Sequence, residues 1–204
     1  MAGVQKRKIR WAIFLLLVML YFSGLPAEAQ YGGGSGAAND PYLIFTAEQM
    51  NSIGAEPNDW DKHFKLMADI DLSGFDGKEG RLAFNMIAPD TGTVKWYYKG
   101  TAFTGVFDGN GHTISNFSYN TKERNYIGLF GCVKGKNAEI KDLGLIDPNV
   151  NAGTGDYVGS LVGFLETGTT ITGCYARGGK VSGNWRKAPK RGPGGAHRRG
   201  VKSA

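Results

Sequence analysis

The sequence predicts an all-β fold in which short strands stack on one another as repeated coils, and three observations lead to this prediction. Glycine accounts for 32 of the 204 residues, which provides for many tight turns. Short apolar runs are separated by glycine, asparagine or aspartate about every 8 to 12 residues, as in chains of many short strands. A segment of about 31 residues occurs twice, and repetition at a fixed period indicates stacked units.

Residues 1–29 have the features of a secretory signal peptide. Basic residues precede an apolar run from Trp11 to Phe22, and Ala27-Glu28-Ala29 matches a small-x-small cleavage site. An apolar run of about 12 residues is shorter than the roughly 20 that a membrane span needs. We therefore expect a secreted or cell-surface protein that begins at Gln30 after cleavage and has no transmembrane span.

Two short segments are expected before the coils. Residues 30–40 are rich in glycine and serine and are predicted to form a flexible linker, with the fold beginning after it. Residues 41–60 are predicted to form a strand and a short capping helix, because Thr46 and Gln49 have the spacing of a capping box. Gly54 is expected to end this helix, whose apolar residues recur at three-residue spacing, at Ala47, Met50 and Ile53.

Residues 61–183 are expected to form the stacked coils. One alternating strand is predicted from Phe64 to Leu72, and later strands are predicted at 102–107, 113–117, 126–133, 140–146, 157–165 and 170–175. The repeat aligns Gly128-Leu129-Phe130-Gly131 with Ser160-Leu161-Val162-Gly163, and Ile140, Leu143 and Val150 with Ile171, Cys174 and Val181. One such unit cannot bury its apolar face alone, so equivalent residues are expected to form ladders in a shared interior.

The cysteines and the charges are interpreted by their position in the chain. Cys132 aligns with Phe164 and Cys174 with Leu143, so we expect two separate small apolar side chains rather than a disulfide, although an exported protein permits one.

Residues 30–183 hold 13 basic and 17 acidic residues, a net charge of −4, and no nucleic-acid partner is expected. Residues 184–204 hold seven basic residues and no acid. They are predicted to be a disordered basic tail, either a polybasic arm or the product of a truncated or frame-shifted reading frame.

The repeated segments resemble GLUG-motif repeats. The resemblance is carried by Gly128-Leu129-Phe130-Gly131, Gly159-Ser160-Leu161-Val162-Gly163 and Gly179-Lys180-Val181-Ser182-Gly183, and it covers about residues 41–183. It implies a bacterial secreted or surface protein and a right-handed parallel β-helix or closely related solenoid. It implies no catalytic role for the repeats, of which about two full copies are present.

A search for catalytic and metal sites gives only weak candidates. The histidines, His63, His112 and His197, never have a paired zinc spacing, and no cofactor is expected. The segment that starts with Asp108 and Asn110 resembles a calcium loop but lacks the distal glutamate of such a loop. Asp69, Asp71 and Asp76 are a looser group of candidate oxygen ligands. Asp69 and Asp71 also lie two apart on the predicted strand and so resemble a catalytic acid pair, although a solvated face is the more common arrangement.

Aromatic residues are the better candidates for ligand binding. Trp96, Tyr97 and Tyr98 are consecutive, so at least one of them must point outward from a strand. Aromatic rings with polar tips suit sugar or peptide surfaces; the alternative is that they cap an open end of the stack. We therefore expect a non-catalytic module for adhesion or ligand binding, with an extracellular glycan or a host or matrix protein as partner. The alternative is an N-terminal fragment of a larger exported enzyme, a peptidase or polysaccharide-active protein, whose catalytic part is absent.

Overall fold

The computed structural model describes residues 30–92 and 97–183, and those from Tyr31 onward belong to one compact unit. The predicted signal peptide and basic tail lie outside the described residues. Within them the chain is mostly strands, with one α-helix, α2 (Ala47–Ala55), and two short 3-10 helices, η1 (Pro57–Asp59) and η2 (Ser73–Phe75). The predicted all-β class is confirmed at this level.

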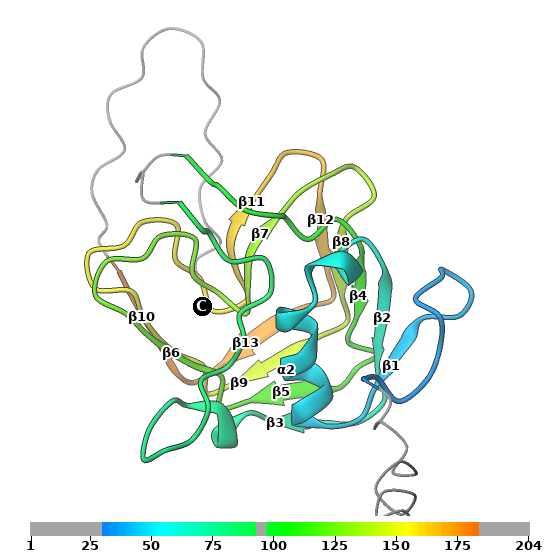
Figure 1. Cartoon of the computed structure of the whole chain (residues 1–204), viewed down its shortest axis with the longest axis horizontal. Helices are drawn as coiled ribbons and strands as arrows, with labels where there is room; N and C mark the ends of the chain where they lie inside the picture. Colours follow the sequence, from blue (N-terminus) through cyan, green and yellow to red (C-terminus); the bar gives the residue numbers. More distant parts are fainter. Residues whose placement is uncertain (1–29, 93–96, 184–204) are drawn as a thin grey trace, which may run out of the picture. The chain divides into compact units, whose positions relative to one another are not determined.

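The strands pair in parallel to form four sheets (Figure 1). The largest has the order β1 (Tyr42–Ile44), β2 (His63–Leu66), β4 (Val106–Asp108), β8 (Glu139–Lys141) and β12 (Thr170–Thr172). The second has the order β13 (Tyr175–Arg177), β9 (Gly144–Ile146), β5 (Thr113–Ser115) and β3 (Ile70–Asp71). The others are β14 (Lys180–Ser182), β10 (Asn149–Asn151) and β6 (Ser118–Asn120), and the pair β11 (Val162–Leu165) and β7 (Phe130–Val133).

The strand register confirms the repeat that the sequence predicted. Ile140 pairs with Ile171 and Val150 with Val181 across neighbouring parallel strands. Phe107, from the less complete earlier copy, pairs with Ile140. Because side chains alternate between the two faces of a strand, this register places equivalent apolar residues of successive repeats on the same face of the sheet.

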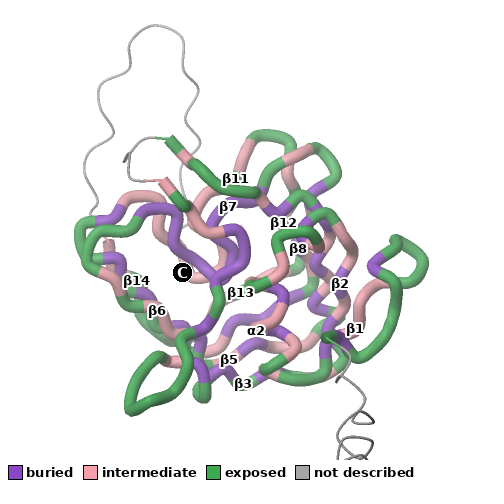
Figure 2. The backbone as a smooth tube through the Cα atoms, viewed as in Figure 1, coloured by how far each residue is buried: buried purple, intermediate pink, exposed green. Residues whose placement is uncertain are grey.

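The apolar side chains of all four sheets meet in one core. Figure 2 shows buried stretches recurring along neighbouring strands, while most exposed stretches lie in the connections. Phenylalanine rings join two of the sheets: Phe64 and Phe107 of the largest sheet are stacked with ring centroids 6.4 Å apart, and Phe130 of β7 meets Phe107 edge-on at 5.4 Å. Leu129, another predicted ladder residue, is fully buried.

One turn of the repeat uses the left-handed backbone region at the same place each time. Asn116, Asp147 and Gly178 follow paired strand ends and have φ angles of 59°, 49° and 70°. Asparagine, aspartate and glycine are the residues that adopt this region most readily. The amides of Asn116 and Asp147 donate to carbonyls one repeat further on, those of Ile146 (3.0 Å) and Arg177 (2.9 Å).

The segment 30–40 differs from the predicted flexible linker, because it packs against the body. Tyr31 is 6% exposed, and its hydroxyl donates to Asp59 at 3.0 Å. The Gly36 carbonyl accepts from the amide of His63 at 2.9 Å. The small residues of this segment permit close backbone approach, so residues 31–40 belong to the folded body.

Two further predictions are wrong in detail. Helix α2 continues through Gly54 to Ala55. A Cβ at Gly54 would lie 1.8 Å from the Asn85 carbonyl oxygen, so this glycine serves a close contact and does not end the helix. The single strand predicted from Phe64 to Leu72 is divided into β2 and β3 by a corner after Leu66.

The two cysteines are both free and lie in different parts of the repeat, as the alignment predicted. Cys132 pairs with Phe164 in the β7–β11 sheet. Cys174 lies between β12 and β13, beside Leu143, whose carbonyl accepts from the amide of Tyr175 at 3.1 Å. Burial raises the pKa of the Cys132 thiol to about 12, so this thiol is protonated at neutral pH and is a poor nucleophile.

The start of α2 offers a first test of local stability. The Thr46 side chain accepts from the Gln49 amide at 3.2 Å, and Gln49 Oε1 in turn accepts from the Phe45 amide at 2.8 Å. Replacing Thr46 with alanine is expected to lower the free energy of unfolding by about 1 kcal/mol, because it leaves a helix amide without its partner. Urea denaturation followed by circular dichroism measures this; the matched control Thr46→Ser, which keeps the acceptor, should lose less than half as much.

Candidate ligand-binding groove

A shallow groove with a volume of about 580 Å³ lies beside η1. Its lining comes from three separate parts of the chain, namely Pro57, Asn58, Trp60 and Asp61, then Tyr97, Tyr98, Gly100, Thr101, Ala102 and Thr104, and finally Lys134, which follows β7. The mixture is aromatic, small and polar, with one acidic and one basic side chain, Asp61 and Lys134. Such a combination can stack on a ring and hydrogen-bond to its substituents.

The predicted aromatic candidates have different positions. Trp96 lies outside the described residues. Tyr97 is 67% exposed and lines the groove, so one of the consecutive aromatic residues does face solvent. Tyr98 is held inward: its hydroxyl lies 2.8 Å from the Thr101 carbonyl and 3.2 Å from that of Ala88, and its ring meets Tyr126 edge-on at 5.3 Å.

The inner part of the groove is rigid. Trp60 is 3% exposed and donates its indole N–H to the Ile53 carbonyl at 2.7 Å. The Trp60 carbonyl accepts from the amides of Thr104 and Gly105, at 2.8 and 2.9 Å. Burial raises the pKa of the Tyr98 hydroxyl well above its ordinary value, so this group remains a neutral hydrogen-bonding group at any physiological pH.

The charged groups of the rim are paired with neighbours outside the groove. Asp61 lies 2.9 Å from the Lys62 ammonium, and Lys134 lies 3.3 Å from Glu166. The side chains of Asp61 and Lys134 are 60% and 59% exposed. Exposed ion pairs contribute little free energy. Either side chain can therefore leave its partner and contact a ligand with little loss of stability.

The candidate calcium ligands are hydrogen-bonded to nearby groups. Asp108 accepts from the Asn110 amide at 2.8 Å, and the Asn110 side chain donates to the Leu66 carbonyl at 3.2 Å. Asp69 accepts from the Thr113 amide at 2.8 Å, and Asp71 from the Asn116 side chain at 2.9 Å. Within 30–92 and 97–183, no three His, Cys, Asp or Glu side chains converge as a metal site.

Asp69 and Asp71 do not share one strand, since Asp69 precedes β3 at the corner. The recorded partners of their carboxylates are His112 and Thr113 for Asp69, and Ser73 and Asn116 for Asp71. The Thr113 amide bond chiefly holds the pKa of Asp69 below its usual value, and the Asn116 bond does the same for Asp71. Both groups are therefore ionised and engaged in turns, whereas a general acid needs a raised pKa.

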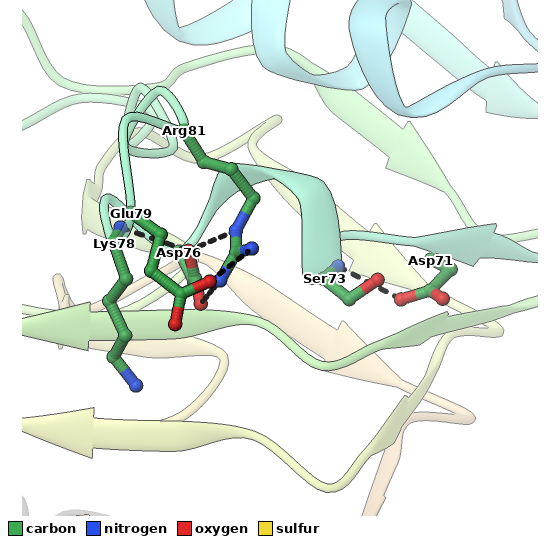
Figure 3. Close-up of polar contacts among 6 residues, drawn as sticks. All are labelled: Asp71, Ser73, Asp76, Lys78, Glu79 and Arg81. Atoms are coloured by element: carbon green, nitrogen blue, oxygen red, sulfur yellow. Dashed lines mark hydrogen bonds and ion pairs between the residues drawn. The ribbon is translucent and has the colours of Figure 1, made fainter.

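Asp76, of the looser group of calcium candidates, braces a surface loop after η2 that the sequence did not predict. Asp76 binds the Arg81 guanidinium through both oxygens, at 2.8 and 2.9 Å, and accepts from the Lys78 amide at 3.0 Å (Figure 3). The Arg81 bonds hold the pKa of Asp76 well below its usual range. The loop presents Leu82 at 70% exposure. The spacing of Asp76 and Arg81 is the only local signal of this contact.

Comparisons with known proteins give partial matches. The chain is 30% identical over 175 residues to a "Putative Gly-rich membrane protein" of Evansella cellulosilytica, a match that covers 84% of this chain and 16% of the relative. It is 32% identical over 144 residues to "Halomucin" of Haloquadratum walsbyi, which covers 69% of this chain and 1% of that protein. No family model and no solved structure matches.

The described helices include none with the length and apolar character to cross a membrane. The chain spans about a sixth of the Gly-rich membrane protein and about a hundredth of halomucin. Over most of its length, it is therefore similar to small parts of much longer proteins.

Proposed function

We propose that this chain is a non-catalytic, secreted or cell-surface repeat module that binds an extracellular glycan through the groove beside η1. The observation that carries the proposal is the exposed Tyr97 ring, which lines the same groove as Trp60, a buried side chain anchored by its hydrogen bond to Ile53. The similarity to a Gly-rich membrane protein and to halomucin supports a place at the cell surface.

We also propose that the body is a solenoid of GLUG-type repeats, a right-handed parallel β-helix. Parallel pairing supports it, since from β4 onward each paired strand follows its neighbour by about one repeat, as Ile140 follows Phe107 and Ile171 follows Ile140. The equivalent left-handed turns at Asn116, Asp147 and Gly178 support it as well. In such a solenoid, binding residues lie on outward faces and connections while the ladders supply rigidity.

A glycan fits the groove better than a small apolar molecule does. Sugars present apolar C–H faces that pack on aromatic rings and hydroxyls that need donors and acceptors. Tyr97 provides the ring, while Asn58, Asp61 and Lys134 provide hydrogen-bond donors and acceptors. The open shape suits a chain that passes across the surface, as adhesion to a polymer requires.

Binding to immobilised chitin, cellulose, xylan and hyaluronan tests the proposal, with collagen and fibronectin as protein surfaces. We expect the full chain to bind at least one polysaccharide. Tyr97→Ala should weaken that binding about tenfold, or about 1.4 kcal/mol, because the stacking ring is lost. Tyr97→Phe, which keeps the ring, should retain most of the affinity.

Leu82→Ala is the control, since Leu82 is an exposed apolar residue outside the groove. It should bind as the unmodified protein does. The glycan assignment would be overturned by binding to collagen or fibronectin alone, by absence of binding to every surface, or by equal affinity of Tyr97→Ala and the parent.

A further inference from the structure

The groove beside η1 is bordered on one side by more acidic than basic side chains. Residues 56–62, which include η1, hold three carboxylates and one ammonium group, those of Glu56, Asp59, Asp61 and Lys62. Asp61 itself lines the groove, and its carboxylate is 60% exposed. A ligand in the groove therefore meets a negatively charged wall on this side.

The other two parts of the lining do not reverse this charge. In the second part, Lys99 follows Tyr98, and the Lys99 amide donates to the Asp90 carboxylate at 2.7 Å. In the third part, Lys134 lies 3.3 Å from Glu166. Each basic side chain is thus accompanied by an acidic one. Within the described residues, the borders of the groove hold five acidic and three basic side chains, a net charge of −2.

Two segments outside the described residues bear on this charge. Residues 93–96 precede Tyr97 and contain one charged residue, Lys95, so the charge around the groove stays negative wherever that side chain lies. Residues 184–204 contain seven basic residues, and these can attract an anionic polymer without any part of the groove. Binding through the groove is therefore recognised by its dependence on Tyr97.

An ion pair with a ligand would add little affinity in this groove. Lys134 is the basic side chain of the described lining, and it already has Glu166 as its partner. A ligand carboxylate could only replace Glu166 in a second exposed pair, and such pairs contribute little free energy. Charges within about 8 Å act on one another at physiological ionic strength, so the acidic border would also repel that carboxylate.

We propose that the groove selects uncharged polysaccharides over those that carry carboxylates or sulfates, an inference that rests on the glycan binding proposed above. Hydroxyl groups both donate and accept hydrogen bonds. Sugar hydroxyls can therefore donate to Asp61 and accept from Lys134 without adding charge. Tyr97, which is 67% exposed, supplies a ring for the apolar face of the sugar, a contact that needs no charge on the ligand.

Binding of the full chain to matched pairs of polymers tests this proposal. Hydroxyethylcellulose and carboxymethylcellulose share a backbone and differ in charge, as do glycol chitin and carboxymethyl chitin. For at least one uncharged polymer, Tyr97→Ala should weaken binding about tenfold at both low and high salt. Any binding of the carboxymethyl polymers should be equal in Tyr97→Ala and the parent and should disappear at high salt, because it arises from basic residues outside the groove.

A charge reversal at the border of the groove supplies a second measurement. Asp61→Lys changes the net charge around the groove from −2 to zero. It should raise the affinity for carboxymethylcellulose at low salt at least about threefold more than Glu123→Lys does. Glu123→Lys makes the same change in total charge at an exposed position outside the groove. Circular dichroism shows whether both variants keep the fold.

The outcomes separate this inference from the proposed function. Tyr97-dependent binding that is equal or stronger for the carboxymethyl polymers would overturn the selectivity and leave glycan binding in place. Equal effects of Asp61→Lys and Glu123→Lys would also overturn it, since the charge at the groove would then not determine the choice of ligand. Absence of Tyr97-dependent binding to every polymer would overturn both proposals.

Discussion

Replacing Phe107 with alanine is expected to lower the free energy of unfolding by about 3 to 5 kcal/mol. Phe107 is fully buried in β4, the middle strand of the largest sheet. It pairs with Phe64 on one side and Ile140 on the other, and its ring meets the rings of Phe64 and Phe130. Alanine would leave a cavity that two neighbouring repeats line, and a rigid sheet cannot close it.

Urea denaturation followed by circular dichroism measures this loss. Single domains are typically stable by about 5 to 15 kcal/mol, so the variant is expected to unfold at a much lower urea concentration with a similar slope. Phe45→Ala is the matched control, since Phe45 is 43% exposed. Its free energy of unfolding should fall by less than about 1 kcal/mol. Equal losses for Phe107→Ala and Phe45→Ala would show that the buried ladder residues do not determine the stability of the fold.

The repeat could be predicted because each ladder position has an apolar residue at a fixed spacing. Ile140 with Ile171 and Val150 with Val181 are paired in the structure as the alignment has them. Period-two alternation also predicted the buried residues from Phe64 to Leu72 correctly, although a corner divides that strand. The pattern of apolar residues does not reveal this corner, because the residues on both sides of it still alternate between the core and the solvent.

What the sequence could not predict depends on contacts between distant residues. The glycines of 30–40 favour flexibility locally. Tyr31 nevertheless fixes the segment, because its hydroxyl donates to Asp59 and its ring packs in the core against Phe64. Gly54 matches a helix end locally, but Asn85 packs against it. Tertiary contacts of this kind override local preference.

The groove was predictable only in part. Three consecutive aromatic residues in a strand place at least one outward, and of the two that the structure describes, Tyr97 is the exposed one. Its partners in the groove, Trp60, Asp61 and Lys134, are separated from it by more than 30 residues and share no motif. The acidic candidates failed to come together because aspartate and asparagine at turns satisfy nearby amides first.

Gly105→Ala is expected to destabilise the protein by about 3 kcal/mol, although Gly105 does not have a positive φ angle. An added Cβ would lie 2.0 Å from the Lys62 carbonyl oxygen, which accepts from the Val106 amide at 3.1 Å. The Gly105 amide and carbonyl are also bonded, to Trp60 and Glu139. The methyl group therefore has to push apart the backbone that joins β2, β4 and β8, and that backbone cannot rotate away as a side chain does.

Thermal unfolding separates this steric cost from the conformational cost of a left-handed glycine. For a domain of this size, about 3 kcal/mol corresponds to a midpoint lower by about 6 to 12 °C. Gly111 has a φ of 79° and open space where a Cβ would lie. Gly111→Ala should therefore lower the free energy of unfolding by only about 1 kcal/mol. Gly74→Ala has neither constraint and should be neutral or slightly stabilising. Equal melting temperatures for Gly105→Ala and Gly74→Ala would contradict the close approach of the neighbouring strands at Gly105. A backbone contact that short cannot be relieved by rotation of one side chain.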